Sequence, residues 1–484
     1  MTYVIDKGRN GNGNHPRQWH GSILVRNMIE WPRCDMPPDI LRRARAYDAD
    51  RPHHPLLRTW EVMLDIDKRT IQGRVPEELW PVPNGNHNHA DEGPSVGTKS
   101  GTSALDEIHT LFDKWLALSD SPARYDQIDI VLAVIVANRL PSDPLWLFLV
   151  APPSSAKTET IQSLNMVPDT FNLSSLTANT FASGFVTDDD SEPSLLDKLK
   201  NKTLVMKDFG SILTMHHDKS GEIYGQLREI YDGAYSKSFG TGKDYTWRGK
   251  VGLLAGVTTL IDKAFALRTT LGERFLMYRI PEIESRRMGL TAIKQQTMNE
   301  SKKRLLLQNE VARYLYRFSS PEMIDISESM ADGLVALAEY VALGRAGVTY
   351  DSVGDIDYVA QPEGPGRLSK QLALLARALA IVRQEPTISR TTYTTIRQVA
   401  FDTIPATRQH LLALLLSLPD GVDLPTATHG TPYSMSMMRR RLDGLVAVNL
   451  AESRGRAGHA THWHASLKLR RLMEDVAHAA TTAE

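Results

Sequence analysis

Apolar residues follow two different spacings along the chain, and these spacings predict its elements. Residues 104–119 carry apolar side chains three and four positions apart, which predicts an amphipathic helix. Residues 125–140 are apolar almost throughout, which indicates a buried helix. Short apolar runs then alternate with helical segments, and they lie at 145–150, 170–177, 203–210 and 251–259. Strands that alternate with helices indicate a parallel α/β sheet across roughly 145–281.

The remaining chain divides into a pattern-poor start and a helical second half. Residues 82–103 are rich in Pro, Gly, Asn and Ser, which predicts a linker. From about Glu282 to His410 the pattern is mainly helical, and a smaller unit follows it. We therefore expect a mixed N-terminal region of unknown role, an α/β core, a helical region and a small C-terminal domain, at 1–103, 104–281, 282–404 and 405–484.

Composition narrows the class of protein. The chain has 484 residues, 42% of them hydrophobic and 23% charged, which is typical of a globular protein. Its net charge of −1 excludes a protein that binds nucleic acid through a uniformly basic surface, so any such surface is a local patch. One cysteine, Cys34, excludes a disulfide framework and a cysteine-based zinc finger, and suits a reducing cytoplasm. The N-terminus lacks the apolar core of a signal peptide, and the apolar runs at 128–140 and 145–150 are too short to cross a bilayer. We expect a soluble, cytoplasmic, multi-domain protein with no membrane partner.

The segment from Ala151 to Thr158 lies between a predicted strand and a predicted helix, where a phosphate-binding loop is found. Such a loop cradles phosphates with backbone N–H groups, while Lys157 would meet the β- and γ-phosphates and Thr158 would face Mg²⁺. The usual pattern G-x-x-x-x-G-K-[ST] has glycine where this chain has Ala151 and Ala156. An ordinary strand–turn–helix connection with a solvated lysine is the alternative. The predicted nucleotide-binding residues of this loop are Pro153, Ser154, Ser155, Ala156, Lys157, Thr158 and Glu159.

Three further positions have the spacing that partners of such a loop require. Asp208 ends an apolar strand and would hold Mg²⁺ together with Thr158, although a lone Asp there is also a common turn former. Thr258, or Thr259 beside it, ends the next buried strand and would sense the γ-phosphate, or would simply cap the strand. Arg274 precedes another strand and would reach the nucleotide of a neighbouring subunit, or would form a surface salt bridge. The predicted catalytic residues are Asp208, Thr258 and Arg274.

Together these residues resemble an AAA+ ATPase, and their layout over roughly 105–470 is most similar to MCM-type helicases. The resemblance implies a P-loop AAA+ core with a parallel sheet, a helical lid, and ATP bound between the subunits of a homo-oligomeric ring, a hexamer. It also implies that Arg367, at the start of a lid helix, closes over the nucleotide.

Residues 234–250 predict a hairpin inserted just before the strand that ends at Thr258. MCM-like proteins carry a DNA-gripping hairpin at this place, so the resemblance implies contact with single-stranded DNA in the pore. Tyr245 and Trp247 would stack on bases or pack within the hairpin. The predicted DNA-binding residues here are Lys237, Lys243, Arg248 and Lys250.

The C-terminal pattern of two helices, a strand and a Gly-containing hairpin resembles a winged helix, which docks on duplex DNA or on a protein. Residues 425–471 hold 8 Lys and Arg against 2 Asp and Glu. The His459, His462 and His464 run would bind metal or would simply lie on the surface. The side chains predicted to face DNA are Ser434, Ser436, Arg439 and Arg440 on the helix, with Arg454 and Arg456 on the wing.

These observations favour an ATP-dependent DNA helicase or translocase of phage or mobile-element type, with ATP and Mg²⁺ as cofactors. A hydrolysis-deficient AAA+ scaffold that binds DNA or partners is the first alternative, because both loop glycines are replaced. A transcription regulator whose ATPase controls the winged helix is the second.

Overall fold

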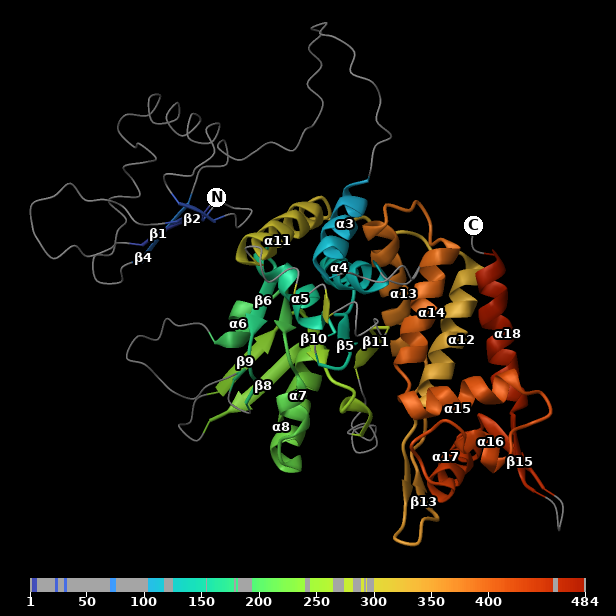
Figure 1. Cartoon of the computed structure of the whole chain (residues 1–484). Coiled ribbons are helices and arrows are strands. Elements are labelled where there is room, and N and C mark those ends of the chain that lie inside the picture. The colour runs from blue at the N-terminus through green and yellow to red at the C-terminus, as the bar shows by residue number, and fades with distance from the viewer. Residues whose placement is uncertain are drawn as a thin grey trace, which may run out of the picture. The chain divides into compact units, whose positions relative to one another are not determined.

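Figure 1 shows the computed structural model of the chain. Packing divides the chain into two compact units, one of 1–111, 166–168 and 294–316, the other of 112–165, 169–293 and 317–484. The predicted boundaries at 281/282 and 404/405 fall inside the second unit. The structure describes residues 103–116, 125–153, 155–177, 180–181, 194–239, 244–263, 274–281, 289–290, 293, 300–455 and 460–482, with the backbone of four short strands before residue 75.

The first unit contains two antiparallel strand pairs, β1 with β4 and β2 with β3, and a long helix, α11. Helix α3 begins in this unit. The predicted linker at 82–103 lies outside the described residues except for Ser103. The bounds are β1 (Thr2–Asp6), β2 (Ser22–Leu24), β3 (Glu30–Pro32), β4 (Thr70–Arg74), α3 (Ala104–Leu116) and α11 (Glu300–Tyr316).

Within the described residues, a five-stranded parallel sheet forms the centre of the second unit, in the order β11–β5–β10–β7–β6. The inner strands are almost continuously apolar and buried, as is expected of a parallel sheet covered on both faces. This confirms the α/β fold with a parallel sheet that the sequence predicts. The strands are β5 (Trp146–Val150), β6 (Thr170–Leu173), β7 (Lys202–Met206), β10 (Val251–Val257) and β11 (Phe275–Arg279).

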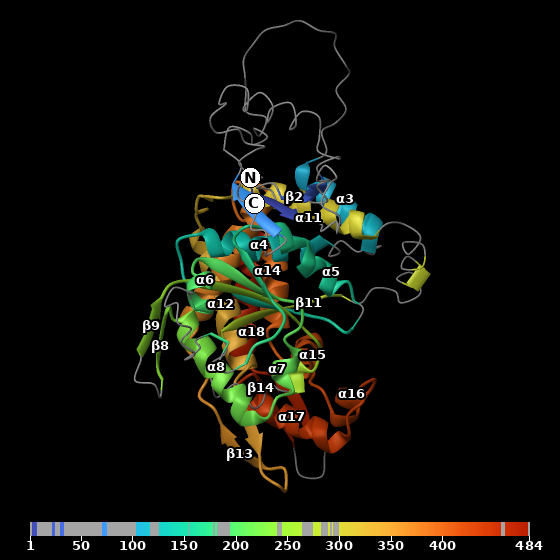
Figure 2. The same cartoon turned by 90° about the vertical axis from the view of Figure 1, so that its left-hand side faces the viewer.

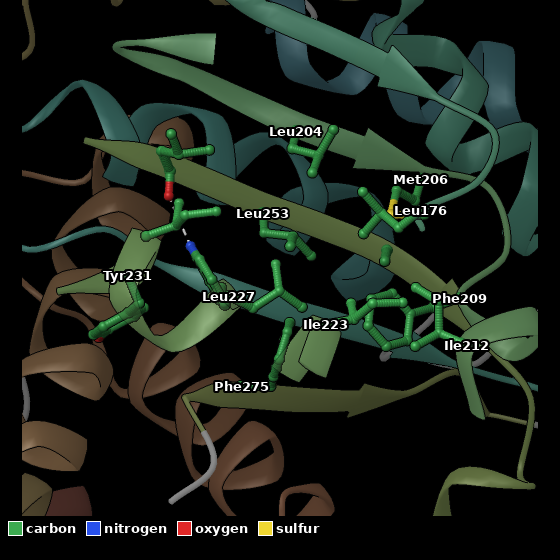
Figure 3. Close-up of a cluster of buried hydrophobic side chains, with 14 of the residues drawn as sticks. Leu176, Leu204, Met206, Phe209, Ile212, Ile223, Leu227, Tyr231, Leu253 and Phe275 are labelled. Atoms are coloured by element: carbon green, nitrogen blue, oxygen red, sulfur yellow. Dashed lines mark hydrogen bonds between the residues drawn. The ribbon is translucent and has the colours of Figure 1, made fainter. Parts of the chain in front are cut away.

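A buried core joins one face of the sheet to α7 (Gly210–Leu213) and α8 (His217–Tyr231). Phe148 and Phe275, on adjacent strands, stack with their ring centroids 3.9 Å apart. Trp146 meets Tyr231 edge to face at 5.2 Å. Side chains from strands and helices meet in this layer in Figure 3, among them Leu204, Met206, Leu253, Ile223 and Leu227. Between the strands along the chain lie α4 (Asp126–Arg139), α5 (Lys157–Gln162), a short 3-10 helix (Ser163–Met166) and α6 (Leu195–Leu199).

The helical region consists of α12, α13 and α14, which pack beside one another, and the C-terminal helix α18 packs against α12 and α14 (Figure 1). Ser327 and Ser389 begin two of these helices, because their hydroxyls accept the backbone N–H groups of Met330 and Thr392. The predicted buried helix is confirmed as α4, and α13 packs against it. The bounds are α12 (Glu328–Gly344), α13 (Gly366–Val382), α14 (Arg390–Asp402) and α18 (Leu467–Thr482).

A short antiparallel hairpin interrupts this helical region. Strands β12 (Val348–Tyr350) and β13 (Ile356–Val359) pair with each other between α12 and α13. The prediction of a mainly helical segment from Glu282 to His410 is therefore wrong at this point. Strands of three and four residues are too short to produce a clear alternating pattern, and that is why the sequence does not show them.

The C-terminal elements include the two predicted helices and the predicted hairpin, but a short helix, α16, lies between those helices, and the chain ends in α18, which packs against α12. The hairpin of β14 and β15 is antiparallel, and Val422 forms an isolated bridge to Trp463 on β15. In Figure 2 this part of the chain is drawn in red and orange-red around the labels α15, α16 and α17. The bounds are α15 (Ala406–Ser417), α16 (Leu424–Thr428), α17 (Met435–Ala447), β14 (Ala451–Arg454) and β15 (His462–Ala465).

None of the helices in the described ranges has both the length and the apolar character that crossing a bilayer demands.

Candidate functional site

The predicted phosphate loop connects the end of β5 to the start of α5. The N–H of Ala151 donates to the carbonyl of Val257 at 3.1 Å, so the loop begins against the end of β10. Ala156, directly before α5, has a φ of 62° and lies in the left-handed region. An L-residue there is strained by about 1–2 kcal/mol, whereas glycine is not. The position where the usual pattern has glycine therefore keeps a conformation that suits glycine.

Lys157 begins α5 and is only 7% exposed. Its Nζ donates to the carbonyl of Val257 at 2.9 Å and to that of Ala151 at 3.2 Å. Burial lowers the pKa of this ammonium, and the nearby charge of Asp208 opposes that shift. Lys157 therefore links the phosphate loop to the end of β10, within electrostatic reach of the predicted Mg²⁺ ligand.

Asp208 is exposed just beyond the end of β7, and its Oδ1 accepts the N–H of Gly210 at 2.7 Å. The strand register pairs Val150 with Val257 and Met206 with Ala255. The carboxyl ends of β5, β10 and β7 thus meet at one edge, as parallel strands require, with β10 in the middle. This arrangement brings the loop and Asp208 together, as the sequence predicts.

Thr258 follows β10 and is half-buried, whereas Thr259 is exposed. Their carbonyls accept the N–H groups of Ile261 and Asp262, both at 3.1 Å, which closes a helical turn. Because β10 lies between β5 and β7, this turn starts between Lys157 and Asp208. A hydroxyl at this place can contact a group bound between those two side chains.

Gly256 allows the three strand ends to approach. A Cβ at this position would lie 2.5 Å from the carbonyl of Lys207 and 3.2 Å from the Cδ of Lys157. The N–H of Phe209 donates to the Gly256 carbonyl at 2.8 Å. The sequence reasoning did not single out Gly256, although a glycine inside an otherwise apolar strand is a known sign of close backbone approach.

The other predicted loop residues divide by exposure. Pro153 and Thr158 are exposed, Glu159 is half-buried, and Ser155 is buried with its hydroxyl donating to the Pro152 carbonyl at 2.7 Å. Ser154 lies outside the described residues. The exposed hydroxyl of Thr158 and the exposed carboxylate of Asp208 are oxygen donors of the kind that Mg²⁺ takes, since this ion binds through few protein ligands and keeps several waters. The residues present therefore fit ATP with Mg²⁺.

Arg274 and Arg367 lie at the opposite edge of the sheet from the phosphate loop. Phe275 pairs with Trp146, the first residue of β5. Arg274 therefore lies at the amino ends of the strands, and the length of β5, roughly 16 Å, separates it from the loop. Arg274 forms a bidentate ion pair with Asp232 at 2.8 and 3.1 Å. The structure does not bring Arg274 to the Lys157 of its own chain.

Arg367 is ion-paired with Glu363 at the start of α13. Its charge acts on Tyr231, whose ring packs against the first residue of β5. Arg367 therefore shares the amino edge with Arg274, and the structure does not place it over the phosphate loop of the same chain.

A half-buried ionic network that the sequence reasoning missed lies beside the loop. Arg279 ends β11 next to Val150 and pairs with Asp262 at 2.7 Å, while its N–H donates to Asp402 at 2.8 Å. Asp262 also accepts the N–H of Ala406, the first residue of α15, at 3.1 Å. Burial raises the pKa of Asp402 to about 7. The network joins the turn after Thr258 to α14 and α15. Its members are up to 144 residues apart, so no local sequence pattern predicts it.

The predicted basic hairpin is confirmed as the antiparallel pair β8 (Ala234–Ser238) and β9 (Asp244–Arg248). Tyr235 and Trp247 pair across it and are buried, and the Tyr245 hydroxyl donates to Asp197 at 3.2 Å. In this structure Tyr245 and Trp247 therefore pack within the hairpin and against its neighbours, which is the alternative to base stacking. The opposite face is exposed and carries Ala234, Ser236, Ser238, Asp244, Thr246 and Arg248.

The predicted DNA-contacting lysines of this segment lie in different surroundings. Lys237 is half-buried and lies over the Phe239 ring at 5.7 Å. Lys250 donates to the Leu140 carbonyl at 2.8 Å, and burial lowers its pKa to about 8, so it does not share the exposed face with Arg248. Lys243 lies outside the described residues.

Helix α17 and the β14–β15 hairpin hold the predicted duplex-contacting side chains. Ser434 caps α17 by accepting the Met437 N–H at 3.3 Å, and the exposed Arg439 lies 3.7 Å from Asp443. Arg454 is exposed beside Glu452 at 3.2 Å. Ser436 is exposed, Arg440 contacts the β12–β13 hairpin, and Arg456 and His459 lie outside the described residues. In the described part of the chain, no three His, Cys, Asp or Glu side chains gather around a possible metal position.

Comparison with known proteins adds no family: the chain matches no protein-family model, and a search of curated proteins finds no match.

Proposed function

We propose that this protein is an ATP-dependent DNA translocase or helicase of the AAA+ class. The observation that carries the proposal is the convergence of Lys157, Thr258 and Asp208 at the carboxyl edge of a parallel sheet, where α/β proteins bind nucleotides. A buried lysine at a helix start, within electrostatic reach of an exposed carboxylate, is the pair of charges that MgATP requires.

In this function the chain's own groups bind and orient the nucleotide. Lys157, whose Nζ donates to two backbone carbonyls, would bind phosphate oxygens together with backbone N–H groups at the start of α5. Thr158 and Asp208 would hold Mg²⁺, which neutralises phosphate charge and orients the transferred group when it is bound. Thr258 would contact the γ-phosphate and relay its presence to the turn that ends at Asp262.

The positions of Arg274 and Arg367 support assembly into a ring. Both lie about a strand length from the phosphate loop of their own chain, so any action on ATP is directed at the nucleotide of a neighbouring subunit. A subunit that offers its loop at one end of the strands and two arginines at the other can make head-to-tail contacts, and such contacts form a ring when the rotation between neighbours closes. We propose a homo-oligomeric ring, a hexamer by resemblance to MCM-like helicases.

Two surfaces would contact DNA. The exposed face of the β8–β9 hairpin presents three hydroxyl side chains and Arg248, which suit the phosphate backbone of a single strand, and it also carries one acid, Asp244. The α17 and β14–β15 elements, with the bridge from Val422, have the composition and order of a winged helix, which suits duplex DNA.

A hydrolysis-deficient scaffold is the second candidate, and one observation favours it. Ala156 keeps a left-handed backbone that glycine would hold without strain, and its methyl group would narrow the approach of a phosphate to the loop. A loop of this kind can bind ATP without completing the geometry for turnover.

The test is ATP hydrolysis by the full chain, with and without single-stranded DNA, compared with Lys157→Ala and Ala156→Gly. Turnover that DNA stimulates and that Lys157→Ala abolishes supports the motor. If the natural chain does not hydrolyse ATP but Ala156→Gly does, the result supports a motor that is inactivated at its phosphate loop. If neither the natural chain nor Ala156→Gly hydrolyses ATP, and both still bind it, the result supports the scaffold.

A further inference from the structure

The outward face of α17 is covered by another part of the same chain. Met438, Leu442 and Leu445 are buried and define the side of the helix that faces its core. At 100° per residue, Arg440 and Gly444 lie on the opposite side, which is the side that a winged helix turns toward a DNA groove. In this structure that side meets the hairpin of β12 and β13.

Two hydrogen bonds hold the hairpin on the helix. The Tyr350 hydroxyl donates to the Arg440 carbonyl at 2.7 Å, and the Arg440 Nη2 donates to the Val353 carbonyl at 2.9 Å. Gly354, with a φ of +101°, lies so close that any Cβ there would overlap the Arg440 guanidinium. Arg440, one of the predicted DNA contacts, is therefore already hydrogen-bonded to the hairpin turn, although its side chain stays exposed.

The contact also fills the space that DNA would need. Gly444 is buried although it points away from the core, because a Cβ there would lie 2.5 Å from the Tyr350 hydroxyl. Burial raises the pKa of that hydroxyl, with the charges of Arg408 and Arg440 opposing the shift. A DNA groove and the hairpin cannot occupy this face of α17 together.

The β12–β13 hairpin is acidic, whereas elements that bind DNA are usually basic. Residues 348–359 contain Asp351, Asp355 and Asp357 and no Lys or Arg, and all three carboxylates are exposed. Asp351 shapes the turn by accepting the N–H groups of Val353 and Gly354 at 2.9 and 2.6 Å. Three exposed carboxylates beside a basic helix repel a phosphate backbone rather than attract it.

We propose that the β12–β13 hairpin is an autoinhibitory cover of α17, which competes with duplex DNA for Arg440 and must leave before the helix enters a groove. The first turn of α17, with Ser436 and Arg439, stays exposed beside the cover. The proposal rests on the duplex-binding part of the proposed function and not on ATP turnover.

The test compares two glycine variants of the full chain. Gly354→Ala places a Cβ where the flexible end of the Arg440 side chain lies and where φ is positive, so it should displace Arg440 from the Val353 carbonyl and strain the turn, which loosens the hairpin. Gly364→Ala is the matched control, because no atom lies within 4 Å of its Cβ position. Binding of a short fluorescent DNA duplex of mixed sequence is measured by anisotropy at fixed salt. We expect Gly354→Ala to bind about tenfold more tightly, which corresponds to losing one or two hydrogen bonds of the cover, and Gly364→Ala to bind like the natural chain.

Two more variants keep the outcome clear if Gly354→Ala alters the hairpin itself. Tyr350→Phe removes one hydroxyl and should tighten binding in the same direction by a smaller factor. Adding Arg440→Ala to Gly354→Ala should remove the gain. Equal affinities in all variants, or weaker binding by Gly354→Ala and Tyr350→Phe, would overturn the cover. ATP turnover of the same preparations tests the motor separately, so either idea can fail alone.

Discussion

The ammonium of Lys157 lies 2.9 Å from the carbonyl oxygen of Val257, 100 residues later in the chain. Because the same group also donates to Ala151, the lysine of the candidate nucleotide site is hydrogen-bonded to the backbone of the loop and of β10. Phosphate must displace two hydrogen bonds from a buried ammonium before it can bind. The affinity of the site for nucleotide therefore depends on the conformation of the loop as well as on its charge.

Loop strain gives the first prediction. Ala156→Gly should stabilise the fold by about 1 kcal/mol, because glycine adopts the left-handed conformation without a Cβ penalty. It should also raise ATP affinity, since the phosphate path loses a methyl group. Urea unfolding and nucleotide titration measure the two effects. Gln384→Gly, at another residue with positive φ, is the control and should leave ATP binding unchanged. A destabilised Ala156→Gly chain would contradict the strain.

Asp208 gives the second prediction. Asp208→Asn keeps an acceptor for the Gly210 N–H but removes the charge that would hold Mg²⁺. We expect turnover to fall by at least about 100-fold, with the free energy of unfolding changed by less than about 0.5 kcal/mol, because the side chain is exposed. Asp218→Asn, an exposed carboxylate on α8, should leave turnover as it is. Full activity of Asp208→Asn would show that Asp208 does not hold the Mg²⁺ of the reaction.

The arginine at the far edge of the sheet gives the third prediction. Arg274→Ala should lower turnover by on the order of 10³-fold if Arg274 acts on a neighbour's ATP. Asp232→Asn breaks the same ion pair but leaves the arginine, and should change turnover only a few-fold. Mixing Arg274→Ala subunits with Asp208→Asn subunits should restore activity, because some interfaces then hold one intact copy of each residue. Equal losses in Arg274→Ala and Asp232→Asn, with no rescue on mixing, would assign Arg274 to the internal pair alone.

The buried carboxyl beside the loop gives the fourth prediction. Burial raises the pKa of Asp402 from 3.8 to about 7, so the folded state holds this proton more tightly than the unfolded chain does. The stability from this group is therefore fully present below about pH 4 and is lost as the pH rises through about 7. Asp402→Asn should flatten the pH dependence of the free energy of unfolding in that window, by up to about 1.4 kcal/mol per pH unit.

Urea unfolding at several pH values measures this difference. Asp420→Asn is the control, because Asp420 is exposed, and it should leave the pH profile of the natural chain unchanged. Parallel profiles for Asp402→Asn and the natural chain would mean that Asp402 is ionised when folded.

Local pattern was sufficient to locate the strands of the sheet, the loop before Lys157, the acid at Asp208 and the β8–β9 hairpin. Each of these depends on a few neighbouring residues: a run of apolar side chains, a turn, or a charge at a strand end. The same reasoning failed at β12 and β13, whose strands are too short for a period to be visible.

What local pattern could not supply is which distant groups meet. The order β5–β10–β7 places Thr258 between Lys157 and Asp208, and the register places Arg274 at the other edge. Asp402 is buried against Arg279, and the exposed Arg440 is hydrogen-bonded to Tyr350 and Val353. These partners are separated by many tens of residues, so their contacts depend on how strands and helices pack and not on neighbours in the chain. Sequence determines the chemistry that each segment carries, whereas packing determines which of those groups is buried, paired or left open to a ligand.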